Sequence, residues 1–239
     1  MGAPTAESKP KPAQPPPSVV AILQTQPSQL YAHLHPVLLL SLVFFSFAQL
    51  VNHPVNTLLR LAPVTAILQA IYCVVCLPST GQIPHQPGQK KKTGKSAQGA
   101  WAKVVPTCFS FVLTLTLSVP ILYIIAILFG APLTTHHPHT LLLALHLALL
   151  TCPPLFYAHG LDAPTWLQIV SLQLPIDEVY GMSLGACVGA WVGAIPIPLD
   201  WDREWQKWPV TIIIGLYVGV VVGKVAGGYL FKGMKIKLS

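Results

Sequence analysis

Residues Val179–Phe231 read VYGMSLGACVGAWVGAIPIPLDWDREWQKWPVTIIIGLYVGVVVGKVAGGYLF and carry two series of glycines. Each series places a glycine at every fourth position, the spacing that aligns residues on one face of an α-helix. Such a face lets two helix backbones approach closely, so helices can associate in lipid through packing. These faces are therefore candidates for contact with a partner or a substrate, through Gly181, Gly185, Gly189 and Gly193 in the first series and Gly215, Gly219 and Gly223 in the second.

The two series lie in apolar runs that are long enough to cross a bilayer, which takes about 20 residues. Val179–Ile197 contains no charged residue, and Val210–Phe231 contains only Lys224. We interpret the pair as a membrane hairpin with a tryptophan-rich loop bracketed by prolines. This loop is either a recognition surface of defined shape or part of an aromatic belt at the membrane surface, and its candidate contact residues are Pro196, Pro198, Asp200, Trp201, Arg203, Trp205, Trp208 and Pro209.

The composition excludes a soluble domain. Of 239 residues, 53% are hydrophobic and only 9% are charged, and the mean hydropathy is +0.60, whereas soluble proteins carry about 25% charged residues. The sequence therefore predicts an all-α, polytopic membrane protein with about six transmembrane helices, the last two forming the glycine-striped hairpin. Membrane lipids are the expected surroundings, and we expect no nucleic-acid partner because no nucleic-acid-binding motif occurs.

Three regions are predicted along the chain. Residues 1–30 form a Pro/Lys-rich tail that is expected to be disordered, residues 31–231 form the membrane domain, and residues 232–239 form a basic tail. Apart from the hairpin, the membrane domain is expected to have spans at Leu34–Val51, Val55–Leu77, Val104–Gly130 and Thr140–Tyr157.

Other segments of the membrane domain are predicted from proline content and length. Residues 78–103 are expected to form a flexible basic loop, which is either a topology determinant or a contact for anionic lipid or protein. Pro120 is expected to kink the third span or to end a straight part of it. Thr165–Leu174 is apolar but too short to cross a bilayer, so we expect an interfacial or buried segment.

The charge distribution predicts the orientation. Six spans place both termini on one side of the membrane, and most lysines and arginines lie in the two tails and in the 78–103 loop. Because basic segments stay in the cytoplasm, both termini are expected to be cytoplasmic and the loop at residues 196–209 is expected to lie on the far side.

The acidic residues are expected to be split between the two sides of the membrane. Metal-dependent phosphoryl chemistry needs several carboxylates and histidines around its ions. Asp162, Asp177 and Glu178 are expected on the cytoplasmic side, and Asp200, Asp202 and Glu204 on the other. Because the carboxylates are split, we expect no catalytic residue, metal or cofactor. The alternative is that the far-side carboxylates join His136, His137 and His139 to hold a metal.

Lys224 is the charged residue inside the last span. Its stem is long enough to extend towards the cytoplasmic interface, and we expect it to do so. The alternative is a contact with an acidic group of a partner or with a lipid phosphate.

The loop and the helix before it resemble a known family. The sequence PIPLDW at Pro196–Trp201, followed by Arg203, Trp205-Gln206 and Trp208-Pro209, is similar to the signature near the carboxyl end of the PIG-F family. The run Gly185–Trp191 resembles the glycine-rich helix of the same family. The family commonly has proline between Arg203 and Trp205, where this chain has Glu204, and the proline-rich tail resembles fungal members.

This resemblance implies a multi-pass protein of the endoplasmic reticulum membrane that takes part in glycosylphosphatidylinositol (GPI) anchor biosynthesis. It implies a non-catalytic accessory subunit that stabilises the large GPI ethanolamine phosphate transferases, whose catalytic domain is lumenal and transfers ethanolamine phosphate to mannose of the GPI lipid precursor. The 196–209 loop would then be lumenal and face the partner. Two other classes stay open, a lipid transporter and a small membrane-embedded lipid phosphotransferase.

Overall fold

Helices make up the regular structure of the part of the chain that the computed structural model describes, which is residues 19–80, 101–132, 134–199 and 201–236. The predicted all-α class is thereby confirmed. The elements are α1 (Gln26–Asn52), α2 (Pro54–Cys76), α3 (Trp101–Leu113), η1 (Thr114–Ser118), α4 (Val119–Leu128), α5 (His137–His159), α6 (Ala163–Val170), α7 (Glu178–Ala194), η2 (Glu204–Gln206), α8 (Val210–Val225) and η3 (Ala226–Leu230).

Within the described residues, five helical segments are long and apolar enough to cross a membrane: α1, α2, the continuous helix 101–128, α5 and the continuous helix 210–230. The chain is therefore a multi-pass membrane protein. Helix α7 has only 17 residues and is about 26 Å long, less than the ~30 Å hydrocarbon core. The predicted count of six spans is thus not established by length and composition, which give five.

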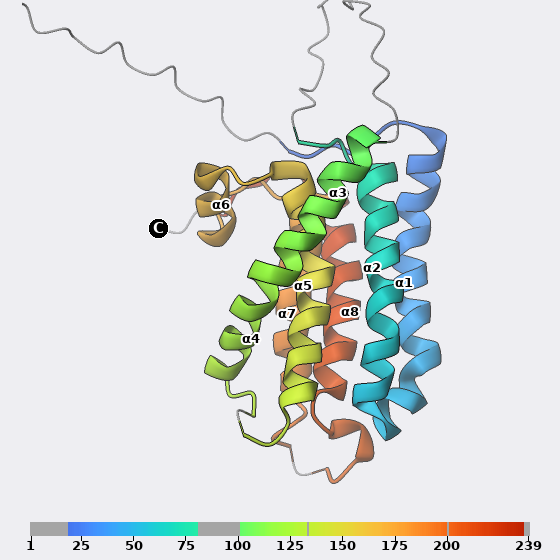
Figure 1. The fold of residues 1–239 in the computed structure, drawn as a ribbon, viewed down its shortest axis with the longest axis vertical. Helices are drawn as coiled ribbons and strands as arrows, with labels where there is room; N and C mark the ends of the chain where they lie inside the picture. The colour runs from blue at the N-terminus through green and yellow to red at the C-terminus, as the bar shows by residue number, and fades with distance from the viewer. Residues whose placement is uncertain (1–18, 81–100, 133, 200, 237–239) are drawn as a thin grey trace, which may run out of the picture.

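Helix α5 lies at the centre of the bundle (Figure 1), where it packs against α2, α3, α4, α7 and α8. Of the residues in its most apolar stretch, 72% are buried inside the chain, whereas only 11% of those in the corresponding stretch of the 101–128 helix are buried. The 101–128 helix therefore lies on the outside of the bundle, with most of its apolar side chains directed outward. Helix α6 lies beside the bundle, at the same end of the bundle as the first and last described residues of the chain.

The first span starts earlier than hydropathy predicts. Helix α1 begins at Gln26 instead of Leu34, because the Thr25 side chain caps it by accepting a hydrogen bond from the Ser28 amide and Pro27 occupies the first turn. Both features start helices irrespective of hydropathy. The predicted disordered tail at residues 1–30 is therefore helical from Gln26 onward, while its first part, like most of the 78–103 loop, lies outside the described residues.

The third span contains a π-helical turn next to Pro120, and the predicted kink there stays a prediction. A five-residue π-helical turn, Thr114–Ser118, immediately precedes Val119–Leu128. Proline cannot donate the backbone hydrogen bond of a regular turn, and a π turn accommodates the missing donor without ending the helix. Helix α6 likewise agrees with the short segment predicted around Thr165–Leu174, and its outer face exposes Leu167 and Val170.

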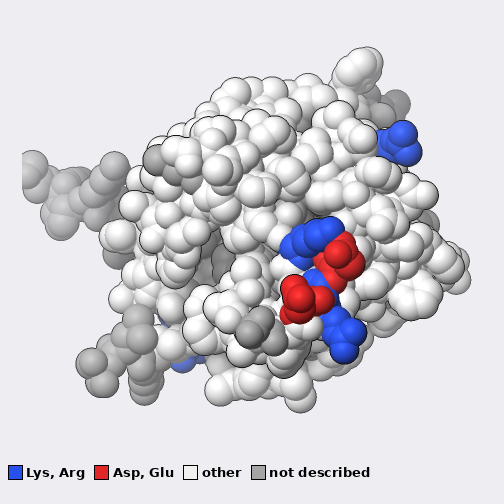
Figure 2. All heavy atoms as spheres, turned by 90° about the horizontal axis from the view of Figure 1, so that it is seen from below, with Lys and Arg blue, Asp and Glu red and all other residues white. Residues whose placement is uncertain are grey.

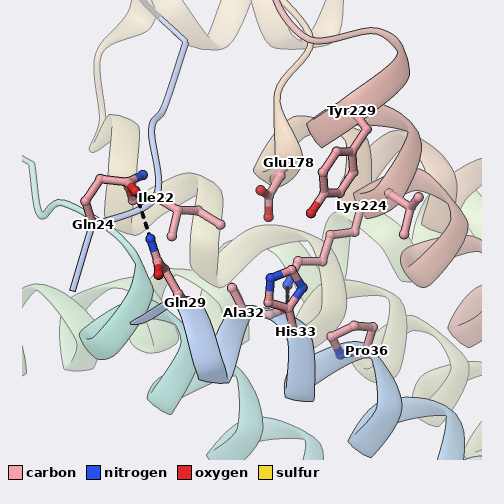
Figure 3. A pocket seen from close by; sticks show the side chains of 10 residues that line it. Ile22, Gln24, Gln29, Ala32, His33, Pro36, Glu178, Lys224 and Tyr229 are labelled. Atoms are coloured by element: carbon pink, nitrogen blue, oxygen red, sulfur yellow. Dashed lines mark hydrogen bonds between the residues drawn. The ribbon is translucent and has the colours of Figure 1, made fainter. Parts of the chain in front are cut away.

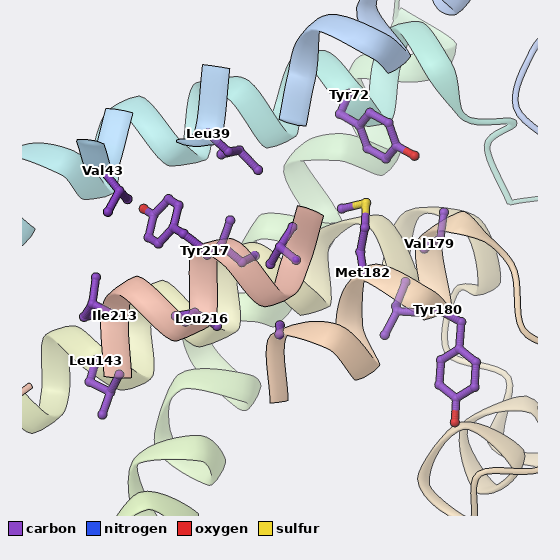
Figure 4. Packing of buried hydrophobic residues seen from close by; sticks show 14 of the residues in the cluster. Leu39, Val43, Tyr72, Leu143, Val179, Tyr180, Met182, Ile213, Leu216 and Tyr217 are labelled. Carbon is purple, nitrogen blue, oxygen red and sulfur yellow. The ribbon is translucent and has the colours of Figure 1, made fainter. Parts of the chain in front are cut away.

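The core is formed by side chains of α1, α2, α5, α7 and α8 (Figure 4). Leu39 and Val43 from α1 face the α8 side chains Ile213 and Tyr217. Both described ends of the chain meet at the start of α7. The amide of Val20 donates to the Asp177 carboxylate, and the amide of Ile176 donates to the carbonyl of Met234.

Candidate functional site

The glycines of α7 and α8 face each other across the interface between the two helices. A Cβ atom added to Gly185 would overlap the backbone of Gly219, and one added to Gly189 would overlap the backbone of Gly215. The same holds for Gly181 against Gly223, while Gly193 faces the carbonyl of Thr211. Any side chain would force the two backbones apart, so these positions require glycine for the close approach.

This arrangement determines which part of the hairpin is available to other molecules. The Cβ side of each glycine is occupied by the other helix of the same chain. The outer face of α7 exposes larger side chains instead, including Val188 at 60% and Trp191 at 64% of full exposure. The predicted contact of the glycines with a partner stays a prediction, and the structure gives them a role within the chain.

The tryptophan loop between the two helices is held by one buried side chain, Gln206. Its Nε2 atom donates to the carbonyls of Pro196 and Leu199, at 2.7 and 2.8 Å. Its Oε1 atom accepts a 2.9 Å hydrogen bond from the amide of Arg203. Three backbone segments of the loop are thereby tied to one amide group, and the turn η2 closes around it.

The outer side of this loop carries most of the charged groups seen at its end of the bundle (Figure 2). Asp202, Arg203, Glu204 and Lys207 are all exposed, and Lys207 forms an ion pair with Glu204. Figure 2 shows charged side chains gathered mainly in one small patch amid uncharged surface. Asp200 lies outside the described residues.

The three tryptophans of the loop have different positions. Trp201 is 53% exposed and its ring lies 5.9 Å from that of Trp205. Trp208 packs against the core, and Pro209 behind it is buried. The loop thus has an inner anchor and an outer aromatic pair beside the charged patch, with Pro196 half-buried and Pro198 exposed.

Lys224 does not extend outward as predicted. Its side chain is only 5% exposed, its Nζ atom donates to the carbonyl of Ala32 at 2.6 Å, and it lies 4.6 Å from the centre of the Tyr72 ring. The Ala32 carbonyl is free to accept because its regular helical partner would be the amide of Pro36, and proline has none. A buried acceptor without a partner is costly, and Lys224 supplies the missing donor.

The carboxylates at the opposite end of the bundle from the loop begin helices. Asp162 caps α6 by accepting from the Thr165 amide, and Asp177 caps α7 by accepting from the Tyr180 amide. Burial raises the pKa of Asp177 above its ordinary range, and the amides of Tyr180 and Val20 counteract this by stabilising the charged form. Both residues thus have structural roles that involve backbone amides.

His146 is a structural residue. Its Nε2 atom lies 3.0 Å from the Leu58 carbonyl and its Nδ1 atom 2.8 Å from the Tyr217 hydroxyl, which lies 2.7 Å from the Thr65 hydroxyl. Since a carbonyl only accepts, Nε2 carries the proton, Tyr217 donates to Nδ1, and Thr65 donates to Tyr217. This network joins α2, α5 and α8. Among the described residues, no group of three His, Cys, Asp or Glu side chains has the arrangement of a metal site.

Comparison with known proteins decides the family. The model of the GPI biosynthesis protein family Pig-F matches residues 34–228, a range that includes α7, the loop and most of the 210–230 helix. The chain belongs to the PIG-F family. It is therefore a multi-pass membrane protein of GPI anchor biosynthesis.

Fungal proteins of this family resemble the chain over most of its length. It is 44% identical to glycosylphosphatidylinositol anchor biosynthesis protein 11 of Neurospora crassa over 90% of the chain and 80% of that protein. The corresponding protein of Pyricularia oryzae is 46% identical over 82% of the chain and 75% of its own length. That of Aspergillus fumigatus is 39% identical over 90% and 83%. No solved structure matches the chain.

The PIG-F loop tolerates the glutamate that stands where the family commonly has proline. Glu204 is the first residue of η2, a position that suits proline as well. Arg203 before it has an extended backbone, with φ −103° and ψ 136°, which is the conformation required before a proline. The loop conformation is therefore compatible with either residue.

Gln206 is the residue of this site that our sequence analysis did not select. It is polar and lies in a loop, and neither hydropathy nor spacing distinguishes it from an exposed glutamine. Its place in the resemblance to the PIG-F signature is the only signal that points to it.

Proposed function

We propose that this PIG-F protein is a non-catalytic accessory subunit that binds and stabilises large GPI ethanolamine phosphate transferases in the membrane of the endoplasmic reticulum. The observation that carries this proposal is the tryptophan loop, which has a fixed inner side and an outer side bearing Trp201 and Arg203. Aromatic and arginine side chains are the residues that contribute most to binding at protein interfaces.

The orientation of the loop supports the same partner. The start of α3, which carries Lys103, lies at the end of the bundle that holds the first and last described residues, and Lys232 is close to the last of these; the loop lies at the opposite end. With basic segments in the cytoplasm, the loop is lumenal. A transferase with a lumenal catalytic domain would meet the loop there, while its membrane helices would pack on exposed apolar faces of the bundle.

The distribution of carboxylates supports a role without catalysis of its own. Asp162 and Asp177 begin helices at one end of the bundle, and Asp202 and Glu204 lie at the other. Phosphoryl transfer needs such groups to converge on one site. In this proposal the transferase catalyses the reaction, and this chain positions and stabilises the transferase. The GPI precursor is a further contact of the chain.

Replacing Trp201 and Arg203 together with alanine tests the proposal. Both side chains are exposed, so the fold should be kept, and loss of a central contact of about 2 kcal/mol should reduce transferase recovered with the tagged chain more than tenfold. The control is Leu161→Ala, an equally exposed position at the other end of the bundle. Leucine at Gly185 would disrupt the chain's own hairpin and is a poorer test. Unchanged recovery of transferase with the loop variant would contradict the proposal.

A further inference from the structure

A cavity of about 180 Å³ lies where the start of α1, the start of α7 and the end of α8 meet (Figure 3). It is far from the tryptophan loop, at the end of the bundle that holds both described ends of the chain. Its lining combines two opposite charges, Lys224 and Glu178, with polar and apolar side chains, among them His33, Gln29, Val225 and Tyr229.

The two charges share the cavity without forming an ion pair. Figure 3 shows the Glu178 and Lys224 side chains extending into the same space, with Tyr229 beside them. Within the described parts of the chain, Lys207 and Glu204 form the one ion pair closer than 4.0 Å. Lys224 uses one donor on Ala32, and an ammonium group has three. Both charged groups therefore have hydrogen-bonding capacity left for a ligand.

The position of the cavity identifies lipid as its surroundings. Val225 and Tyr229 line it and are 47% and 70% exposed on the outer surface of a membrane-spanning helix. Glu178 lies in the first turn of α7, and Lys224 lies in the last turn of α8, which η3 continues to Leu230, so the cavity lies towards this end of the bundle. The cavity opens beside an apolar surface that acyl chains can cover.

We propose that this cavity binds the headgroup of a zwitterionic phospholipid, with the phosphate on Lys224 and the amine on Glu178. A phosphate accepts from ammonium donors and an amine donates to a carboxylate, so each end of such a headgroup meets an opposite charge. An anionic headgroup would place a second negative charge beside Glu178 in a partly buried site without an amine to pair with it, which is unfavourable. This lipid site lies at the opposite end from the tryptophan loop and does not depend on the proposed transferase partner.

The test uses the purified full-length chain in nanodiscs that hold equal parts of phosphatidylethanolamine, phosphatidylcholine and phosphatidylglycerol with identical acyl chains. Lipid that stays bound is measured by native mass spectrometry. We expect a zwitterionic lipid to be retained about tenfold over phosphatidylglycerol, because one charge-assisted contact is worth about 1.4 kcal/mol or more. Equal or preferred retention of phosphatidylglycerol would overturn the proposal.

Variants separate the two charges. Lys224→Met should abolish retention of the zwitterionic lipid, and Lys224→Arg should keep it. Glu178→Gln should raise retention of phosphatidylglycerol, a gain that unfolding cannot produce. Lys207→Gln, at the far end of the bundle, is the matched control and should retain lipid like the unmodified chain.

A soluble competitor distinguishes the two sources of this headgroup chemistry. Glycerophosphoethanolamine carries the same phosphate and amine without acyl chains. If the site belongs to a membrane lipid, this compound at the concentration of the lipid should not displace it. Displacement, or retention in the Lys224→Met variant equal to that of the unmodified chain, would contradict binding of a membrane lipid at this cavity.

Discussion

At the scale of single residues, Gln206 shows how one amide defines a surface. Its side chain bonds Pro196, Leu199 and Arg203 on the inner side of the loop, so the outer side is left to Trp201 and the charged patch. Proline content predicts that the loop has a defined shape. It does not predict the residue responsible, because burial of a loop glutamine depends on contacts that only the folded chain makes.

Gln206→Ala should loosen the loop without unfolding the helices. It removes three hydrogen bonds, to the carbonyls of Pro196 and Leu199 and from the amide of Arg203, at about 0.5–1.5 kcal/mol each. Hydrogen exchange of the amides in residues 196–209 should accelerate, while exchange in α5 stays unchanged. Gln206→Glu should act in the same way because it removes both donors. Lys207→Gln, which loses only an exposed ion pair, is the control, and slow loop exchange in Gln206→Ala would show that the amide does not hold the loop.

At the scale of elements, prolines inside helices determine where polar side chains bind. Proline at position i leaves the carbonyl at i−4 without its helical donor. Two such carbonyls accept from a side chain of another segment: Ala32 from Lys224 and Leu150 from Gln69. The sequence reveals the released carbonyls through Pro36 and Pro154. Which donor reaches each one follows only from the packing of the helices.

Gly219→Ala should separate α7 from α8. The added Cβ meets the backbone of Gly185, which cannot move without its helix, so we expect a loss of about 1–3 kcal/mol or more. Thermal unfolding of the purified chain should show a Tm lower by several degrees. Val218→Ala, next to it on the exposed face of α8, should change the free energy of unfolding by about 0.5 kcal/mol or less. Equal Tm values for the two variants would contradict the close glycine packing.

Tyr217→Phe should weaken the joint between α2, α5 and α8. Removing the hydroxyl leaves His146 Nδ1 without a donor and Thr65 without an acceptor, at about 1 kcal/mol within a membrane protein. In a His146→Leu background the same change should cost less, since part of the network is already lost. Equal losses of stability in both backgrounds would show that the two residues are not coupled.

At the scale of the whole molecule, periodicity and hydropathy predict the fold class and the order of the spans. The gap between the first two spans and the short segment at α6 lie where the sequence predicts them. Helix α1 begins earlier than hydropathy predicts, because capping residues and not apolar ones begin that helix. The glycine spacing does not reveal that the two series face each other, since the same pattern serves a contact within one chain or between two.

In the proposed role this chain works through a large partner. The most direct measurement is purification of the tagged full-length chain in a gentle detergent, with stoichiometric partners identified by mass spectrometry. We predict that a GPI ethanolamine phosphate transferase is recovered in equimolar amount. Recovery of the chain alone, under conditions in which another membrane complex from the same cells stays intact, would contradict the accessory role.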